Sequence, residues 1–328
     1  MVLWCGSPVA TPVLMRILVF GAGAIGSVLG GFLANANHDV TLLGRSWHLD
    51  AVRQHGLRVS GLWGEYHITR AATATSLDAV EEPEALDWVL VCVKAHQTAE
   101  AARALSAFLS PSTFVCAFQN GLGNYEALTQ HLAPSRVALG RVIFGAELEP
   151  SHVRVTVCAD EVLIGAPDPT FPREEVTRLA SALQESGVPT RTTTTIIADL
   201  WAKVLYNCAL NGLSTLLEVP YGKLVEHETT RRLMRAVIEE AYRVAEVQQV
   251  TLSPSSASAY VQLLFTRLIP DTAAHRSSML QDIRRGHLTE IDALNGAIAR
   301  LARAAGVAAP MNALVDELVH EKECFLSI

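Results

Sequence analysis

A glycine-rich turn near the start of the chain has the spacing that cradles a dinucleotide. Gly21, Gly23 and Gly26 follow the apolar run 17–20 in the pattern G-x-G-x-x-G, and an apolar helical run continues to about Ala36. The first glycine permits a tight turn, the second lets a pyrophosphate approach the backbone, and the third lets the helix pack against the strand. The start of the helix would direct unpaired N–H groups at the phosphates. We expect a dinucleotide site here, although a glycine-rich packing turn would have the same spacing. Its expected residues are Gly21, Ala22, Gly23, Ala24, Ile25 and Gly26.

The residue after the second predicted strand indicates which dinucleotide binds. Strand 40–43 ends in Gly44-Arg45-Ser46, close to where NAD-binding units carry an acidic residue for the ribose 2′-hydroxyl. An arginine suits a 2′-phosphate instead, because its guanidinium offers positive charge and paired donors. Arg45 therefore favours NADP over NAD; the alternative is a solvated loop charge.

Two further polar residues follow predicted buried strands. Lys94 comes directly after the strand 88–93, and Asn120 follows the strand 113–118. Ligands of open parallel sheets bind beyond the carboxyl ends of the strands, which is where both residues would lie. A capping lysine and an Asn-Gly turn would explain the same residues without a function.

A stripe of polar residues lies on a long, otherwise apolar helix predicted over 196–217. Lys203, Asn207 and Asn211 are spaced i, i+4 and i+8, which places them on one helix face. Burying a lysine and two amides without partners is costly. The stripe is either solvated or the polar wall of a cleft.

A later segment carries a second group of polar residues. It reads Ser-Ser-Met-Leu-Gln-Asp over 277–282 and Thr-Glu-Ile-Asp over 289–292. The second motif resembles a helix start, with Thr289 as the cap and Asp292 three residues on. Glu290 could then be only a first-turn acid facing the helix dipole.

The elements that must position these residues alternate between strand and helix up to about residue 192. That alternation predicts an α/β fold with a doubly wound parallel sheet. A short hairpin is expected around 57–69 and a β-rich stretch over 137–165. After the threonine run 192–195 the chain is almost entirely helical. We expect an N-terminal extension over 1–14, a nucleotide-binding domain over 15–194 and an all-α domain over 195–328.

Composition excludes several classes of protein. The 328 residues carry a net charge of −7, half of them are apolar, and no basic tract is present, which argues against a nucleic-acid partner. The six cysteines form no C-x-x-C pair, which suggests a reducing cytoplasm and no structural metal site.

The uncharged run from 17 to 34 is not expected to cross a membrane. It contains five glycines and divides into a strand and a helix at the glycine turn. Residues 1–14 lack the basic region of a signal peptide and show no periodicity. Met15 stands directly before the first strand, so a start codon assigned too early would explain the extension equally well.

Taken together, these motifs resemble the ketopantoate reductase family, the NADPH-dependent 2-dehydropantoate 2-reductases of pantothenate synthesis. The resemblance covers nearly the whole chain from Met15. Its carriers are the glycine turn with Arg45, Val93-Lys94-Ala95, Gln119-Asn120-Gly121, Leu200-Trp201-Ala202-Lys203 with the two asparagines, Ser277 to Asp282, and Thr289 to Asp292 with Asn295-Gly296. The late motifs are the most specific, since they occur in the right order.

The resemblance implies a Rossmann domain and a helical domain with the active site between them. It implies that Lys203 is the general acid for the ketone oxygen and that Glu290 supports catalysis beside it. It further implies substrate contacts from Asn207, Asn211 and Ser278. Lys94 and Asn120 match positions beside the cofactor.

The residue types agree with that chemistry. Hydride transfer to a ketone puts negative charge on its oxygen, and a lysine ammonium can stabilise the charge and deliver the proton. A nearby glutamate would hold the ammonium in place and oppose too large a fall of its pKa. Serine and asparagine side chains would bind the carboxylate of a 2-oxo acid.

Three functions remain open at this stage. The first is reduction of 2-dehydropantoate, and the second is reduction of another branched or aromatic 2-oxo acid, which Tyr221 suggests because the family pattern favours an asparagine-like contact there. The third is a non-catalytic NADPH sensor, which would need neither Lys203 nor Glu290. The oligomeric state is not determined by the sequence, with which a homodimer is compatible.

Overall fold

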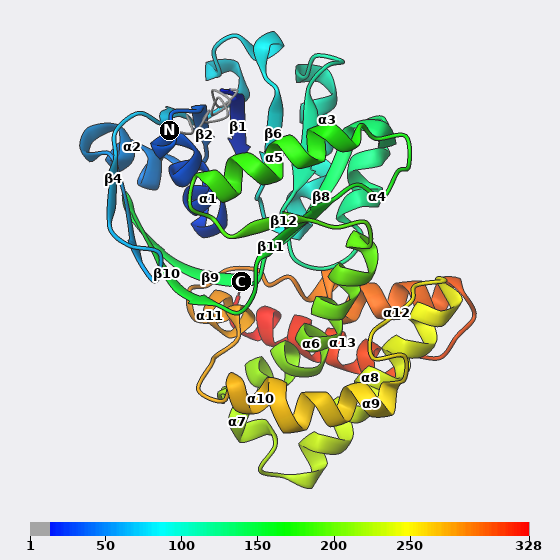
Figure 1. The fold of residues 1–328 in the computed structure, drawn as a ribbon. Helices are drawn as coiled ribbons and strands as arrows, with labels where there is room; N and C mark the ends of the chain where they lie inside the picture. Colours follow the sequence, from blue (N-terminus) through cyan, green and yellow to red (C-terminus); the bar gives the residue numbers. More distant parts are fainter. Residues whose placement is uncertain (1–13, 328) are drawn as a thin grey trace, which may run out of the picture.

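The computed structural model describes residues 14–327, and it consists of a sheet-containing part followed by a helical part (Figure 1). Most of the expected N-terminal extension, residues 1–13, lies outside the described residues. The last strand of the first part ends at Thr192 and the long helix of the second begins at Ile196. We propose that the domains divide between these two residues, as the threonine run predicts.

The first unit of the fold is the strand–turn–helix that the glycine spacing predicts. Strand β1 (Arg16–Phe20) is followed by helix α1 (Ala24–Asn35) and by β2 (Asp39–Leu43), which pairs with β1 in parallel. Ile17, Leu18 and Val19 of β1 are buried because the sheet is covered on both faces. This unit places the glycine turn at the carboxyl end of β1, an interior strand of the sheet.

The main sheet is mostly parallel, as predicted, but it is mixed at one edge. Its strands are, in spatial order, β12 (Thr190–Thr192), β11 (Val162–Gly165), β8 (Val137–Arg141), β7 (Phe114–Ala117), β6 (Trp88–Val91), β1, β2 and β5 (Ala72–Ala74). The exceptions are β11 and β12, which are parallel to each other but run opposite to the other six strands, since β11 pairs antiparallel with β8. Between β8 and β11 the chain forms the hairpin 144–158 and no crossover helix, so it re-enters the main sheet beside β8 in the opposite direction.

A second sheet was not expected from the sequence. The predicted hairpin forms from β3 (Leu57–Gly61) and β4 (Tyr66–Ile68), and β3 also pairs with a later hairpin of β9 (Phe144–Glu149) and β10 (His152–Cys158). These long strands curve away from the main sheet in Figure 1. The β-rich stretch 137–165 therefore contributes to two sheets.

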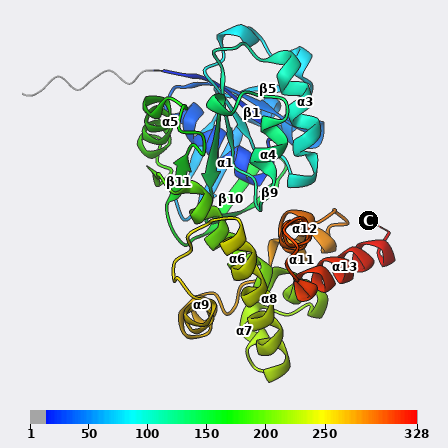
Figure 2. The ribbon, with the colours of Figure 1, turned by 90° about the vertical axis from the view of Figure 1, so that its right-hand side faces the viewer.

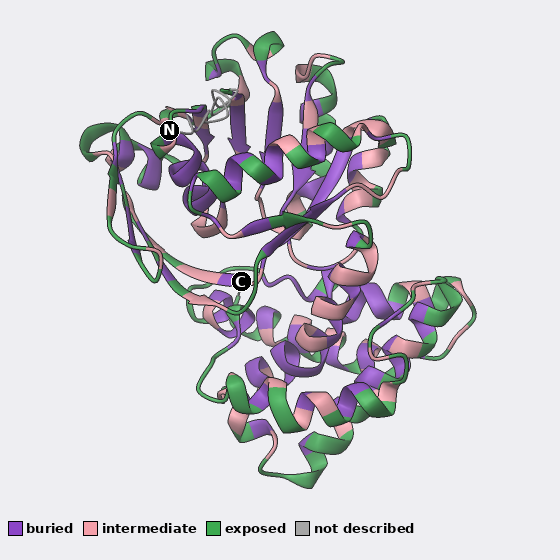
Figure 3. Ribbon diagram, in the orientation of Figure 1, coloured by how far each residue is buried: buried purple, intermediate pink, exposed green. Residues whose placement is uncertain are grey.

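Helices cover both faces of the main sheet (Figure 2). One buried cluster joins the sheet to α1, to the helix over 173–185 and to the second sheet. Another joins it to the helices over 98–108 and 124–129 and to the start of the long helix that begins at Ile196. Buried residues accordingly run along the central strands in Figure 3. The remaining helices of this part are α2 (Ser46–His55), α3 (Thr98–Phe108), α4 (Asn124–Thr129) and α5 (Arg173–Glu185).

The second part packs its helices around α6 (Ile196–Leu217), which has the bounds that the sequence predicts. The other helices are α7 (Tyr221–Leu224), α8 (Glu228–Val247), α9 (Ala257–Leu263), a π-helical turn (Leu264–Leu268), α10 (Ile269–Asp271), α11 (Ser278–Arg284), α12 (Asn295–Ala304) and α13 (Pro310–Phe325). Pro310 opens the last helix, as expected. Within residues 14–327, none of the helices combines the length and apolar character needed to cross a membrane.

The helix start expected at Thr289 is wrong in one respect. The Thr289 hydroxyl accepts a hydrogen bond from the Ile291 N–H at 3.2 Å, but only a 3₁₀ turn, η6 (Ile291–Ala293), follows. Leu294 then adopts φ −110° and ψ −104°, outside the helical region, so α12 begins at Asn295. Glu290 therefore lies in a tight turn ahead of the helix.

Candidate active site

The glycine turn has the shape of a pyrophosphate cradle. A Cβ at Gly21 (φ +110°) would lie 2.6 Å from the Val93 nitrogen, and one at Gly26 would lie 2.2 Å from the Gly21 oxygen. A Cβ at Gly23 would meet no described atom within 4 Å, so this glycine faces open space. No side chain caps α1, which leaves its first N–H groups directed outward. The turn therefore fits a dinucleotide phosphate at the start of α1.

Arg45 lies beside this cradle. The Leu43 oxygen at the end of β2 accepts hydrogen bonds from the nitrogens of Gly21 and Ala22, which brings the end of β2 against the turn. Arg45 is exposed at the start of α2, and its guanidinium has no ion-pair partner among residues 14–327. It is thus free to bind an anionic group of a nucleotide.

Lys203 projects from α6 toward the carboxyl edge of the main sheet. Its Nζ donates to Asn120 Oδ1 at 2.5 Å and to the Val142 oxygen at 2.5 Å. Burial lowers the pKa of Lys203 to about 8; Glu290 opposes this shift and Arg141 adds to it. The ammonium form therefore predominates at neutral pH, and its proton is more easily donated than that of an ordinary lysine.

Glu290 is joined to Lys203 through Asn120, not by a direct hydrogen bond. Its carboxylate accepts from Asn120 Nδ2 at 3.0 Å and from the Ala95 nitrogen at 3.1 Å. The Asn120 amide thus uses its oxygen for the lysine and its NH₂ for the glutamate. Glu290 acts on Lys203 by its charge and by orienting the amide that both share.

The structure brings the expected substrate residues to one pocket. Its lining consists of Asn120, Asn207, Asn211, Ser278, Met279, Asp282, Glu290 and Leu294. Asn207 and Asn211 of the α6 stripe therefore line a cleft together with Ser278 of α11, whereas Lys203 is not in the lining and contacts it through Asn120. Within this lining, Met279 and Leu294 supply apolar surface.

Tyr221 lies beneath this pocket and is not part of its lining. The ring is only 2% exposed, and its hydroxyl donates to Asn211 Oδ1 at 2.6 Å. The sequence suggested Tyr221 as a contact for an aromatic substrate, and its burial removes that reason. Its observed role is to hold the amide of Asn211.

Lys94 follows directly after Val93, whose backbone packs against Gly21 of the glycine turn, and its side chain reaches α11. Its Nζ lies 2.7 Å from Asp282 Oδ2 on α11 and 3.8 Å from Glu290 Oε2. Burial opposes the charge on Lys94, but Glu290 and Asp282 together raise its pKa. The sequence did not single out Asp282 as a partner of Lys94, because the two lie 188 residues apart.

Comparison with known proteins agrees with this geometry. The family model "Ketopantoate reductase PanE/ApbA" matches residues 17–169, and its C-terminal counterpart matches residues 195–323. The 2-dehydropantoate 2-reductase of Aquifex aeolicus is 39% identical over 312 residues, covering 95% of this chain and 98% of its own. The chain belongs to the ketopantoate reductase family.

Solved ketopantoate reductases and one relative of a different name share the whole fold. A ketopantoate reductase of this family from Ralstonia eutropha is 33% identical with a TM-score of 0.85, covering 96% of this chain and 100% of its own. A D-mandelate dehydrogenase solved with NADH and anilino(oxo)acetate is 28% identical with a TM-score of 0.83 over the same shares. The predicted resemblance and the predicted two-part fold are confirmed. The fold of ketopantoate reductases therefore also serves a protein with another substrate.

Proposed function

We propose that the protein reduces 2-dehydropantoate to (R)-pantoate in pantothenate and coenzyme A biosynthesis, with hydride from NADPH and Lys203 as the general acid. The observation that carries this proposal is the contact between the Lys203 ammonium and Asn120, which lines the same pocket as Asn207, Asn211 and Ser278. Relatives named 2-dehydropantoate 2-reductase, which align over nearly the whole chain, support it.

Each residue type has a defined task in this reaction. Bound NADPH supplies the hydride. The Lys203 ammonium stabilises the negative charge that develops on the ketone oxygen and then donates its proton. Asn207, Asn211 and Ser278 offer amide and hydroxyl donors to the substrate carboxylate. Asn120 orients the ammonium, and Glu290 keeps its pKa from falling further.

Steady-state kinetics across 2-oxo acids test the proposal. We expect 2-dehydropantoate to give the highest kcat/KM with NADPH as the reductant. A folded protein that binds NADPH but does not oxidise it with 2-dehydropantoate would overturn the proposal.

The same panel tests a second candidate, reduction of another branched or aromatic 2-oxo acid. The structural similarity to D-mandelate dehydrogenase favours this alternative, since that protein was solved with the aromatic ligand anilino(oxo)acetate. Met279 and Leu294 provide the apolar surface such a side chain would need. A phenyl-substituted 2-oxo acid with a higher kcat/KM than 2-dehydropantoate would establish it.

We propose NADPH as the preferred cofactor because of Arg45. Arg45→Asp should weaken NADPH binding about 10- to 100-fold, which corresponds to the loss of a charge-assisted contact to phosphate. NADH binding should change far less, because NADH has no 2′-phosphate. Fluorescence titration of both cofactors measures the two dissociation constants.

Arg53→Asp is the matched control for this substitution, since Arg53 lies on the same helix and pairs with Asp50 on the surface. It should leave both affinities unchanged. Equal losses of NADPH and NADH binding in Arg45→Asp would remove Arg45 from the phosphate-binding role.

We further propose that the enzyme is cytoplasmic, acts on a small molecule and binds no nucleic acid. The cysteines Cys92, Cys116, Cys158, Cys208 and Cys324 are all free, which fits a reducing compartment. A homodimer is the oligomeric state that we propose to test first, by light scattering.

A further inference from the structure

The turn that carries Glu290 is held from behind by the last helix. Glu323 on α13 is buried, with 4% of its surface exposed, and its Oε1 accepts a hydrogen bond from the Thr289 nitrogen at 2.7 Å. Thr289 directly precedes Glu290. The backbone beside the catalytic carboxylate is therefore attached to α13, while the carboxylate itself contacts Ala95 and Asn120 of the first domain.

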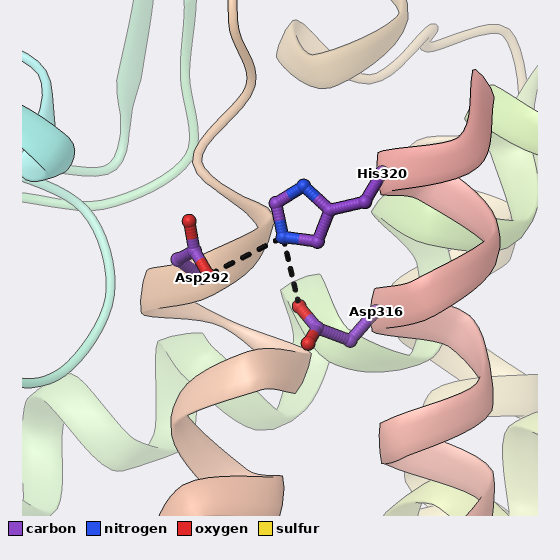
Figure 4. A group of neighbouring side chains, drawn as sticks. All are labelled: Asp292, Asp316 and His320. Atoms are coloured by element: carbon purple, nitrogen blue, oxygen red, sulfur yellow. Dashed lines mark hydrogen bonds and ion pairs between the residues drawn. The ribbon is translucent and has the colours of Figure 1, made fainter. Parts of the chain in front are cut away.

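His320, one helical turn before Glu323, makes a second attachment. Its Nδ1 lies 3.1 Å from Glu323 Oε2, and its Nε2 lies 3.3 Å from Asp292 Oδ1, two residues after Glu290. Figure 4 shows the ring extending from α13 between Asp292 and Asp316, whose Oδ1 lies 3.8 Å from the same Nε2. The turn is thus held on both sides of Glu290.

The protonation state of His320 follows from these partners. Ionised carboxylates only accept hydrogen bonds, so a ring with a carboxylate oxygen at each nitrogen satisfies both contacts only when both nitrogens carry a proton. Only the imidazolium form can therefore donate hydrogen bonds to both Glu323 and Asp292. A neutral ring would lose one of them.

The charges around the ring favour this form. Burial opposes protonation of His320, but Asp292, Glu323 and Asp316 outweigh it and raise the pKa. Other charges face the group from neighbouring elements: the Arg300 guanidinium of α12 lies 3.8 Å from Asp292, and Glu317 lies near Asp316. Asp316 Oδ1 is buried and makes no hydrogen bond to any described residue, so it too benefits from a nearby cation.

We propose that His320 and Glu323 are positioning residues that fix the turn 289–292, and with it the Glu290 carboxylate, against Ala95 and Asn120. The inference rests on the proposed function, because it assigns to α13 the task of setting Glu290 relative to Lys203. Neither side chain touches the substrate pocket. Their effect on the reaction passes through the backbone of the turn.

The attachment should weaken as the pH rises. Because the pKa of His320 lies above its ordinary value of 6.5, the imidazolium is present below pH 6.5 and is lost as the pH passes through the raised pKa. At alkaline pH the wild-type enzyme thus loses one of the two hydrogen bonds of His320. A variant without His320 lacks both hydrogen bonds at every pH, so its activity should not change for this reason.

The test compares His320→Gln and Glu323→Leu, which has no acceptor for the Thr289 nitrogen, with the substitution Glu321→Gln at an exposed position of the same helix. Misplacing a catalytic group by a fraction of an ångström to about 1 Å costs up to about 100-fold. At pH 6 we expect kcat of both variants to be about tenfold lower than that of the wild type, with KM changed by no more than about twofold. Toward pH 9 the difference in kcat between His320→Gln and the wild type should become smaller, because the wild type also loses the imidazolium. Glu321→Gln should behave as wild type.

A second readout does not require turnover. In wild-type protein the ¹H–¹⁵N signal of the Ala95 amide, which donates to Glu290, should shift with the titration of the His320 imidazole, at a midpoint above pH 6.5. In His320→Gln this shift should disappear. These signals can be measured even if the protein reduces no 2-oxo acid. Failure of the proposed function can therefore be distinguished from failure of this inference.

Three results would overturn the inference. The first is a rate ratio for His320→Gln that stays constant from pH 6 to pH 9. The second is a pH-dependent shift of the Ala95 amide signal that is the same in the wild type and in His320→Gln. The third is loss of activity in chelator with recovery on adding zinc, since the ligand atoms of Asp292, Asp316 and His320 lie within 4.8 Å of one another and the cation would then be a metal.

Discussion

Replacing Lys203 with alanine should lower kcat for 2-oxo acid reduction by about 10³-fold or more. General acid catalysis contributes roughly 10²- to 10⁴-fold, and loss of a preorganised charge beside a developing oxyanion adds to that. Among the described residues that contact Asn120 and Glu290, Lys94 is the other cation, and it is held by Asp282 at 2.7 Å. Arg141, whose charge also acts on Lys203, is paired with Asp160 at 2.6 Å, so neither cation is free to replace the missing ammonium.

The pH dependence of the wild-type enzyme provides an independent check on Lys203. Its pKa is lowered to about 8, so the ammonium is present below pH 8 and is lost as the pH rises through that value. The rate of reduction should therefore fall on the alkaline side of about pH 8. The residual rate of Lys203→Ala should not show this fall above about pH 8 (the alkaline limb of the pH–rate profile), because it depends on no group with that pKa.

Two further variants separate chemistry from folding. Lys203→Met keeps most of the side-chain volume without the charge, and it should lose as much activity as the alanine variant. Lys223→Ala removes an exposed lysine on α7 and should leave kcat unchanged. If Lys203→Met retained more than about a tenth of the wild-type kcat, another group would be the acid.

The elements of the site were predictable because their signals are local. The bounds of α6 follow from an apolar run of helical length, and the i, i+4, i+8 spacing fixes which face Lys203, Asn207 and Asn211 share. The three glycines are likewise constrained by contacts within a few residues or with adjacent strands. Periodicity and turn chemistry are sufficient for features of this kind.

The contacts between elements were not predictable from such signals. The Val142 carbonyl that accepts from Lys203 lies at the end of β8, in a segment expected only to be β-rich. The attachment of Glu323 to the Thr289 nitrogen joins residues 34 apart through a helix whose face depends on packing. Side-chain partners of this type depend on the relative placement of whole elements, which composition and spacing do not determine.

The second sheet shows the same limit for the fold. Each strand of its hairpins was detectable, yet β3 pairs with β10 across about 90 residues. Both the main sheet and the second sheet offer edges with which a hairpin could pair. Packing of the second sheet on α1, through residues such as Val59 and Val153, decides between them.

Glu290→Gln should lower kcat about 100-fold at pH 8 and less at pH 6. Glutamine keeps the volume and can still accept from the Ala95 nitrogen, but it removes the negative charge that raises the pKa of Lys203. The pKa of Lys203 should therefore fall below its present value of about 8, because burial and Arg141 are no longer opposed. Less ammonium would remain at any given pH above this lowered value, so the alkaline limb of the pH–rate profile should move to lower pH.

Measuring kcat from pH 5.5 to pH 9 separates this effect from simple loss of structure. Glu246→Gln, an exposed glutamate of α8, is the matched control and should leave the profile unchanged. A loss of activity in Glu290→Gln that is equal at every pH would mean that Glu290 acts only by orienting Asn120. The expected displacement of the alkaline limb therefore distinguishes a glutamate that acts through its charge from one that acts only as a hydrogen-bond acceptor.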